Sequence, residues 1–233
     1  MTIDISTRRL SDHDLNEEEL WRSYNFLLLS PDLARIRKLL VRYRLFELCQ
    51  DIPGDIVECG VFRAAGLAYW AKLLEIFGSN SKKRVIGFDV FAPFNQVPLK
   101  MEEQEIASRH DQLTGGNGVS KEDIAKTVIR AGLQHRVELV QGDIAHTAFA
   151  YVSSNYGFRI SMLHLDLDTY EGTLKALTAF WPAISRGGIV VFDEYAIPGM
   201  GESQAVDEFF ADKDVRPLAV PFSETPTAYL IKS

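Results

Sequence analysis

The chain has 233 residues, enough for one large domain with a full hydrophobic core, and its 46% hydrophobic and 24% charged residues are ordinary for a globular protein. A formal net charge of -7 argues against nucleic acid as the main partner, because phosphate binding needs a basic surface. Residues 1–20 contain no apolar leader segment, and no apolar run is long enough to span a bilayer. Cys49 and Cys59 have no CxxC or zinc spacing and are expected to be buried free thiols, so we expect a cytoplasmic protein without a membrane partner.

Residues 1–52 are expected to form an N-terminal helical segment. Leu15–Leu29 predicts one helix, and Ser30-Pro31-Asp32 supplies an N-cap, a proline at the first helical position and an early acid for a second. Apolar residues of the second helix recur at helical spacing, at Ile36, Leu40 and Tyr43. The basic side chains among them could form a solvated face or meet an anionic substrate. The segment could cover the sheet edge, act as a lid or pair two subunits, so we expect a homo-oligomer, with a dimer as the simplest form.

Strand and helix patterns alternate from Asp55 onward, which predicts one domain over residues 53–233. Five strands are expected at 55–59, 85–89, 137–140, 160–166 and 189–192. Helices are expected at 64–77, 120–131, 144–152, 171–180 and 203–210. Gly187-Gly188 is expected to form the turn into the fifth strand, and strands at 218–220 and 228–231 should pair as a hairpin. Repeated strand–helix units predict an α/β fold: a doubly wound, Rossmann-like sheet of seven strands, mostly parallel with an antiparallel last strand.

Two acidic pairs follow two apolar strands of this predicted sheet. The stretch MLHLDLDTY ends in Asp166 and Asp168, and the next apolar run ends in Asp193 and Glu194. Parallel strands that both end in acids bring these carboxylates to one edge, where ligands of open α/β sheets bind. Clustered carboxylates repel one another unless a cation lies among them, and a hard divalent cation is the usual one. His164 precedes Asp166 inside the apolar strand, and a buried core histidine is expected there rather than a catalytic base.

The ends of the first three strands predict a cofactor site. After the first strand, Glu58 and Gly60 lead through a tight turn into a helix N-terminus. After the second, Asp89 could accept hydrogen bonds from both ribose hydroxyls of an adenosine, and after the third, Gly142-Asp143 could contact an adenine edge. Each of these two acids could instead be only a helix cap or turn residue. No P-loop or GxGxxG motif is present, which favours an adenosine cofactor without phosphate, namely S-adenosylmethionine.

Four motifs in the second half of the chain and around its first strand resemble the macrocin-type sugar O-methyltransferases, a family that includes mycinamicin and novobiocin enzymes. They are VECGVFR (57–63), LDLDTYEGTLKAL (165–177), GGIVVFDEY (187–195) and AVDEFF (205–210). The resemblance implies a class I methyltransferase that uses S-adenosylmethionine and Mg²⁺ on a small-molecule, sugar-containing acceptor. It implies that the metal is held by Asp166, Asp193 and Glu194. It further implies Asp168 as the general base and a cofactor site lined by Glu58, Gly60, Asp89 and Asp143.

The chain departs from the family pattern in three places. Ala64-Ala65 replaces a common Gly-Gly, and Glu194 replaces the second of two aspartates. Residues 1–50 and 91–118, which would shape the acceptor pocket, match poorly. Two other functions stay open: a haloacid-dehalogenase-type phosphatase, because 163–169 fits a DxDxT motif, and a non-catalytic binding protein. The phosphatase motif usually opens its domain, whereas three strand–helix units precede it here, and buried acids without a function are costly.

Overall fold

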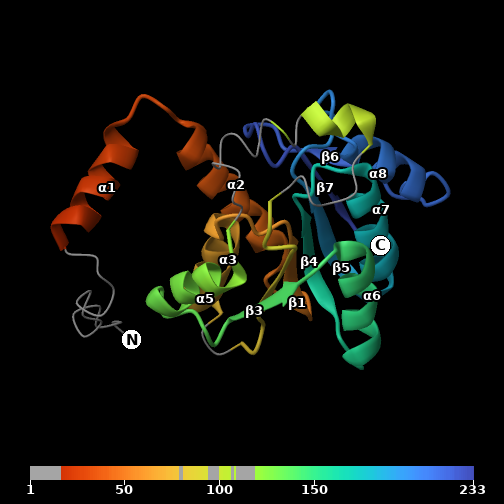
Figure 1. Cartoon of the computed structure of the whole chain (residues 1–233), viewed down its shortest axis with the longest axis horizontal. Helices are drawn as coiled ribbons and strands as arrows, with labels where there is room; N and C mark the ends of the chain where they lie inside the picture. Colours follow the sequence, from red (N-terminus) through yellow and green to blue (C-terminus); the bar gives the residue numbers. More distant parts are fainter. Residues whose placement is uncertain (1–16, 79–80, 94–99, 106–107, 109–118) are drawn as a thin grey trace.

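The computed structural model describes residues 17–78, 81–93, 100–105, 108 and 119–233. Its centre is a seven-stranded sheet with the order β3-β2-β1-β4-β5-β7-β6, covered by helices on both faces (Figure 1). The strands are β1 Asp55–Cys59, β2 Val85–Asp89, β3 Val137–Gln141, β4 Ile160–Leu165, β5 Ile184–Phe192, β6 Leu218–Ala219 and β7 Ala228–Ile231. β1 to β5 pair in parallel, and β7 is antiparallel to both β5 and β6. The predicted fold class and the predicted hairpin are confirmed.

The helices occur along the chain in the predicted order. They are α1 Glu17–Leu29, α2 Ala34–Cys49, α3 Ala65–Phe77, α5 Lys121–Arg130, α6 Ile144–Ser154, α7 Tyr170–Phe180 and α8 Glu202–Phe210, with short 3-10 helices η4 Met101–Glu103 and η5 Trp181–Ala183. The predicted N-cap of α5 is confirmed, because the Ser120 side chain accepts a hydrogen bond from the N–H of Asp123. None of the helices described here is both long and apolar enough to cross a membrane.

Apolar side chains form one core on each face of the sheet. Along β1, Ile56 packs with residues of α2, α3 and α5, whereas Val57 packs with residues of α6, α7 and α8. Alternate residues of a strand point to opposite faces, so a strand covered on both sides is apolar throughout. This explains the apolar run Ile189–Phe192 of β5 and the mostly apolar β4, whose last residues are fully buried. The strands therefore end in a rigid frame, and the polar residues that follow them are held in place.

The N-terminal helices differ in how they contact the sheet. α2 buries Val41, Leu45, Phe46 and Cys49 in the core, whereas α1 buries none of its residues. Figure 1 shows α1 standing away from the layered body and α2 packed against it. α2 is therefore part of the folded core, and α1 presents its apolar side chains to solvent within this single chain.

The predicted start of α2 was wrong by three residues. Its first residue is Ala34 and its N-cap position is Leu33, so Ser30 does not cap it; the N–H of Ser30 bonds to the carbonyl of Phe26 in the last turn of α1. Asp32 instead accepts a hydrogen bond from the N–H of Ala34 at 2.8 Å. Ser30 accepts from the N–H of Asp32, so the two side chains order the connection between the helices.

The predicted turn at Gly187-Gly188 lies inside a strand. β5 begins at Ile184, and its pairing with β4 is irregular between Ile160 and Met162. The N–H of Gly187 donates to the carbonyl of Lys232, so β7 holds this stretch in the sheet. Gly187 has a φ of 79°, which a glycine tolerates without steric cost. The pair of glycines thus forms a distortion within β5 rather than a loop before it.

Candidate active site

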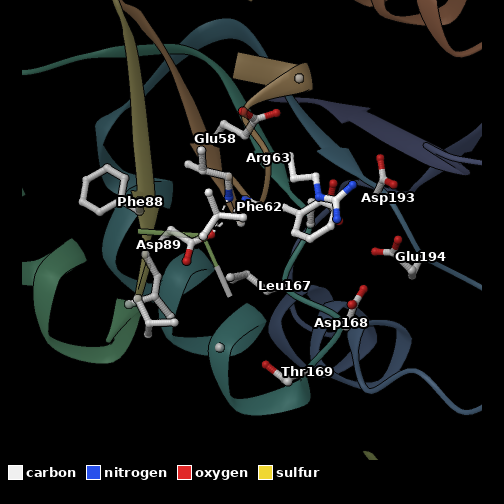
Figure 2. A pocket seen from close by; sticks show the side chains of 18 of the residues that line it. Glu58, Phe62, Arg63, Phe88, Asp89, Leu167, Asp168, Thr169, Asp193 and Glu194 are labelled. Carbon is white, nitrogen blue, oxygen red and sulfur yellow. Dashed lines mark hydrogen bonds between the residues drawn. The ribbon is translucent and has the colours of Figure 1, made fainter. Parts of the chain in front are cut away.

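A cavity of about 570 Å³ opens at the carboxyl ends of the five parallel strands. Every residue that the sequence nominated for a site lines it: Glu58, Gly60, Asp89, Asp143, Asp166, Asp168, Asp193 and Glu194. Figure 2 shows Asp168, Asp193 and Glu194 grouped on one side of the cavity and Asp89 on the opposite side. Three of the predicted catalytic and metal-binding acids and the predicted ribose-binding Asp89 therefore lie on opposite sides of one pocket, whereas Gly60 lies next to Asp166. The 91–118 loop, which was expected to shape the acceptor pocket, lies mostly outside the described residues.

Three carboxylates converge at the acidic end. Oxygens of Asp166, Asp168 and Glu194 all lie within 4.8 Å of one another. Glu194 is 7% exposed, and its Oε2 has no hydrogen-bond partner among the described residues. Burial, together with the charges of Asp166 and Asp168, raises the pKa of Glu194 far above its ordinary value. Burial and the neighbouring Asp193 likewise raise the pKa of Asp166. Oxygen donors with uncompensated negative charge fit a hard divalent cation such as Mg²⁺.

Asp193 is held differently from the other three acids. Its Oδ1 is 3.1 Å from Nε2 of His164, and its Oδ2 accepts a hydrogen bond from Nζ of Lys38 at 3.1 Å. Burial by itself would raise the pKa of Asp193, but the hydrogen bond and charge of His164 and the charge of Lys38 hold that pKa well below its ordinary value. Asp193 is thus an ionised carboxylate. His164, Asp166 and Asp193 also have ligand atoms within 4.8 Å of one another, but each ring nitrogen of His164 faces a carboxylate, so the imidazole is not a cation ligand.

His164 is fully buried and lies between two carboxylates, as the sequence predicted for a core histidine. Its Nδ1 is 3.2 Å from Oε1 of Glu58, on the side opposite to Asp193. The edge of the Trp70 ring packs against its imidazole, with the ring centroids 5.9 Å apart. Burial opposes the charged imidazole, but the hydrogen bonds to Asp193 and Glu58 outweigh it and raise the pKa of His164 to about 9. His164 therefore carries a positive charge at neutral pH and is not a base.

Gly60 brings the ends of β1 and β4 together. Its N–H donates to the carbonyl of Phe88, and the N–H of Asp166 donates to the carbonyl of Cys59. A Cβ at Gly60 would overlap the carbonyl oxygen of Asp166, and the φ of Gly60 is 91°. Only glycine fits this close approach, which places the first strand loop directly beside the acidic cluster.

Gly60→Ala is expected to destabilise the fold by about 3 kcal/mol or more, because backbone strain adds to a clash with a second strand. Gly157→Ala is the matched control, since Gly157 also has a positive φ but no atom within 4 Å of an added Cβ. The control should show only the strain, about 1–2 kcal/mol. Urea unfolding of both variants measures the difference. Equal losses of free energy of unfolding would contradict the close approach.

Asp89 and Asp143 both bond to nearby backbone as well as lining the pocket. Asp89 Oδ2 accepts hydrogen bonds from the N–H groups of Val61 and Phe62, at 2.8 and 3.0 Å, and its Oδ1 accepts from Phe91 at 2.7 Å. Asp143 caps α6 by accepting from the N–H of Ala145 at 2.9 Å. An ionised carboxylate has about four acceptor positions, so each keeps capacity for a ligand. These hydrogen bonds to the backbone therefore hold both side chains in place in the lining of the pocket.

Backbone strain gathers around the same pocket. The described non-glycine residues with positive φ are Phe62, Ala64, Phe91, Asp168 and Ala196. They follow β1, β2, β4 and β5, at the carboxyl edge of the sheet. Each such conformation costs about 1–3 kcal/mol and persists where the surroundings enforce it, often at functional sites. Ala64 is one of the two alanines that replace the glycines of the family pattern, so the loop keeps a glycine-like backbone without the glycine.

α2 supplies basic side chains to the pocket, which the sequence left as either a solvated face or contacts to an anionic substrate. Arg35, Lys38 and Arg42 line the cavity, and Lys38 pairs with Asp193. Arg42 is 6% exposed and lies over the Trp70 ring, 5.7 Å from its centroid. Their spacing of three and four residues puts all three on one helix face, which is a signal present in the sequence. The acid that pairs with Lys38 could not be known from the sequence, because Asp193 lies far away in the chain.

Glu202 is a second side chain that the sequence did not single out. It is fully buried at the start of α8, and its Oε1 accepts a hydrogen bond from the N–H of Glu194 at 3.0 Å. Burial and the charge of Asp193 raise its pKa well above the ordinary value. Through its hydrogen bond to the N–H of Glu194, Glu202 holds the backbone at Glu194 in place.

Comparisons with known proteins agree with this geometry. A sequence model of the family described as macrocin-O-methyltransferase (TylF) matches residues 35–222. An 8-demethyl-8-(2,3-dimethoxy-alpha-L-rhamnosyl)-tetracenomycin-C 4'-O-methyltransferase of Streptomyces olivaceus is 29% identical over 151 residues, covering 64% of this chain and 56% of that protein. A mycinamicin III 3''-O-methyltransferase of Micromonospora griseorubida is 24% identical over 165 residues, covering 70% of this chain and 62% of that protein. The matched region therefore spans less than two thirds of either relative.

Solved structures show the same architecture. The apo structure of CalS11, a TDP-rhamnose 3'-O-methyltransferase of calicheamicin biosynthesis, has a TM-score of 0.68 and 27% identity, over 95% of this chain and 89% of that chain. The O-methyltransferase NovP has a TM-score of 0.70 at 23% identity, over 85% of this chain and 80% of that chain, and supports the fold alone. The resemblance inferred from the strand-end motifs is confirmed. Since the family match covers most of the chain, including every strand end that lines the pocket, the protein belongs to the macrocin-O-methyltransferase (TylF) family.

Proposed function

We propose that this protein is a magnesium-dependent O-methyltransferase that moves a methyl group from S-adenosylmethionine to a hydroxyl of a sugar or sugar-like acceptor. The observation that carries the proposal is the cluster of Asp166, Asp168 and Glu194 within 4.8 Å, at one end of a pocket in a family of methyltransferases. Such a pocket has room for a donor molecule at one end and an acceptor hydroxyl at the acidic end. The relatives' names supply the acceptor class.

The cofactor-binding residues in this proposal are Glu58, Gly60, Asp89 and Asp143. Gly60 lets a ligand approach the backbone closely, and Asp89 and Asp143 keep acceptor capacity for ribose hydroxyls and an adenine amine. Glu58 Oε2 is buried and has no hydrogen-bond partner among the described residues. A buried carboxylate oxygen without a partner is costly, which suits an oxygen that binds a ligand's donor or positive charge. These four residues would hold and orient the methyl donor.

The metal-binding residues in this proposal are Asp166, Asp193 and Glu194. When bound there, Mg²⁺ would lower the pKa of a coordinated acceptor hydroxyl and hold two adjacent hydroxyls in one geometry. Asp168 then takes the hydroxyl proton as general base. The side chains around the pocket align the acceptor oxygen with the donated methyl group, and such positioning supplies much of the rate. Chelation favours acceptors with two vicinal hydroxyls, as in a sugar of natural-product or antibiotic biosynthesis.

Calorimetric titration of S-adenosylhomocysteine into metal-stripped protein, with and without Mg²⁺, tests the donor site. Micromolar binding is expected. Transfer of labelled methyl from S-adenosylmethionine should then be assayed with a TDP-sugar and with a rhamnosylated polyketide, each with and without EDTA. Binding without transfer to any vicinal diol would favour a non-catalytic binding protein. Failure to bind in either condition would overturn the methyltransferase proposal and favour the phosphatase reading of Asp166 and Asp168.

We also propose that the N-terminal segment, residues 1–52, pairs two copies of the chain through α1. That helix exposes 56% of Trp21, 78% of Phe26 and 82% of Leu29, and large apolar side chains concentrated on one short helix mark an interaction surface. α2 would cover the pocket as the inner part of the same segment. The partner is a second copy of this chain.

Light scattering is expected to give a dimer, twice the 26.2 kDa of one chain. Trp21→Glu combined with Phe26→Glu should convert it to a monomer, because two charges in an apolar contact cost several kcal/mol. Tyr156→Glu is the control, since Tyr156 is fully exposed outside α1. A monomeric wild-type chain at micromolar concentration would exclude this interface.

The two cysteines support the proposed cytoplasmic location. Cys49 and Cys59 are buried and free, as predicted. Burial raises the pKa of both thiols, which keeps them protonated and unreactive. Free buried thiols are typical of proteins from reducing compartments.

A further inference from the structure

Three buried ionisable side chains form a row across adjacent strands. Glu58 of β1 pairs in register with His164 of β4, and Asp193 follows the end of β5, which pairs with β4 on its other side. Their residues are between 0% and 1% exposed. The imidazole nitrogens of His164 lie 3.2 Å from Oε1 of Glu58 and 3.1 Å from Oδ1 of Asp193. One ring therefore contacts both the carboxylate proposed to bind the methyl donor and a carboxylate proposed to bind the metal.

Each acid contacts the imidazole of His164 with one of its two carboxylate oxygens. Carboxylate oxygens only accept hydrogen bonds, so a ring that bonds to both must donate from both nitrogens. On the Glu58 side, Oε1 faces the ring while Oε2 has no partner among the described residues. On the Asp193 side, Lys38 donates to the other oxygen and also to Thr225 Oγ1 at 2.8 Å. The Trp70 ring packs against the imidazole and restricts its rotation. The ring thus determines which carboxylate oxygen each acid turns toward it.

We propose that His164 is a positioning residue that orients Glu58 toward the methyl donor and Asp193 toward the metal from a single imidazole ring. This inference rests on the proposed function of the pocket and extends it. Binding of the methyl donor and binding of the metal would both depend on one side chain that touches neither ligand. Loss of the ring should weaken binding at both ends, even though each end keeps all of its own ligand-binding residues.

Binding of S-adenosylhomocysteine by calorimetry and of Mn²⁺ by electron paramagnetic resonance tests this without any turnover. His164→Gln is expected to weaken both affinities about tenfold or more, the size of effect seen when a residue that orients a metal ligand is lost. A glutamine donates to one carboxylate but turns its carbonyl oxygen toward the other. His135→Gln is the matched control, because His135 is an exposed histidine that contacts Glu75 outside the pocket. Wild-type affinity for both ligands in His164→Gln would overturn the proposal.

A second variant separates positioning from general damage. In Glu58→Gln combined with His164→Gln, the amide at 58 can donate to the glutamine carbonyl at 164, which leaves the amide at 164 to donate to Asp193. Mn²⁺ affinity should return to within about threefold of wild type, whereas S-adenosylhomocysteine should stay weak because Glu58 is gone. No recovery of Mn²⁺ binding would contradict the positioning role. Wild-type protein that binds neither probe would instead refute the proposed function itself, and the inference with it.

A measurement on the unaltered chain remains decisive if either variant fails to fold. Nitrogen-15 labelling of histidine should resolve two ring-nitrogen signals for the fully buried His164. Addition of S-adenosylhomocysteine should shift the Nδ1 signal, which faces Glu58, and addition of Mg²⁺ should shift the Nε2 signal, which faces Asp193. Ring-nitrogen signals that move with neither ligand would overturn the proposal.

Discussion

Replacing Asp168 by asparagine is expected to lower kcat by about 10²–10⁴-fold, the range typical for loss of a general base. The amide matches the carboxylate in shape but cannot take a proton. Asp168 has a φ of 60°, and asparagine is one of the few residues that tolerates this left-handed conformation, so the backbone should not move. Affinity for S-adenosylhomocysteine is expected to stay at the wild-type value, which confines the effect to turnover.

A control variant and a second measurement separate the possible roles of Asp168. Asp214→Asn is the matched control, because Asp214 is exposed and lies outside the pocket. Mn²⁺ affinity separates two roles for Asp168, whose oxygens also lie within 4.8 Å of those of Asp166 and Glu194. Unchanged Mn²⁺ affinity with low kcat identifies a base, whereas a parallel fall in both identifies a metal ligand. Near-normal turnover would remove Asp168 from either role.

Asp166→Asn is expected to abolish stimulation by Mg²⁺, because Asp166 belongs to the group of three carboxylates that could hold a cation. Metal affinity should fall by more than the roughly 10–100-fold that loss of an outer-sphere partner costs. Methyl transfer by the variant should be the same with EDTA as with Mg²⁺. Asp214→Asn again serves as the control, and its response to Mg²⁺ should match wild type. If Mg²⁺ still stimulates Asp166→Asn as before, the metal binds elsewhere.

The same variant should be more stable than wild type when no metal is present. Burial and neighbouring acids raise the pKa of Asp166, so its ionised form is disfavoured in the folded state. A raised carboxyl pKa contributes stability below the unfolded value of about 3.9, and this is lost as the pH rises toward the folded value. At pH 7 the neutral amide avoids that loss, and Tm should rise by about 2–4 °C per kcal/mol of relieved repulsion. The wild-type chain should gain Tm on addition of Mg²⁺, and the variant should not.

The sequence was sufficient to predict the fold, the strand ends and the eight pocket residues, because these depend on local patterns. A short apolar run preceded by glycines, such as Ile189–Phe192, predicts a buried strand, and parallel strands place the acids that follow them at one edge. A glycine after a strand predicts a tight turn at Gly60, but its close approach to the carbonyl of Asp166 is visible only in the structure. Chain-order patterns could not locate the start of α2 or the distortion in β5. At the first place, Ser30 still belongs to the last turn of α1 through a hydrogen bond to Phe26; at the second, a long-range hydrogen bond from Gly187 to Lys232 overrides the local turn preference.

Only the tertiary structure decided how the charges pair. Lys38 comes 155 residues before Asp193 in the chain, and His164 comes 106 residues after Glu58. No sequence periodicity connects residues at such separations. Packing of α2 on the sheet brings Lys38 to Asp193, and the register of β1 with β4 brings Glu58 to His164. Burial then decides which acids are ionised, since Asp193 has cationic partners while Glu194 has an acidic neighbour in Asp166. The sequence by itself therefore determined which strand-end acids reach the pocket, and the folded packing determined their charge and the basic residues beside them, because charge in a buried site depends on contacts that form only when distant segments meet.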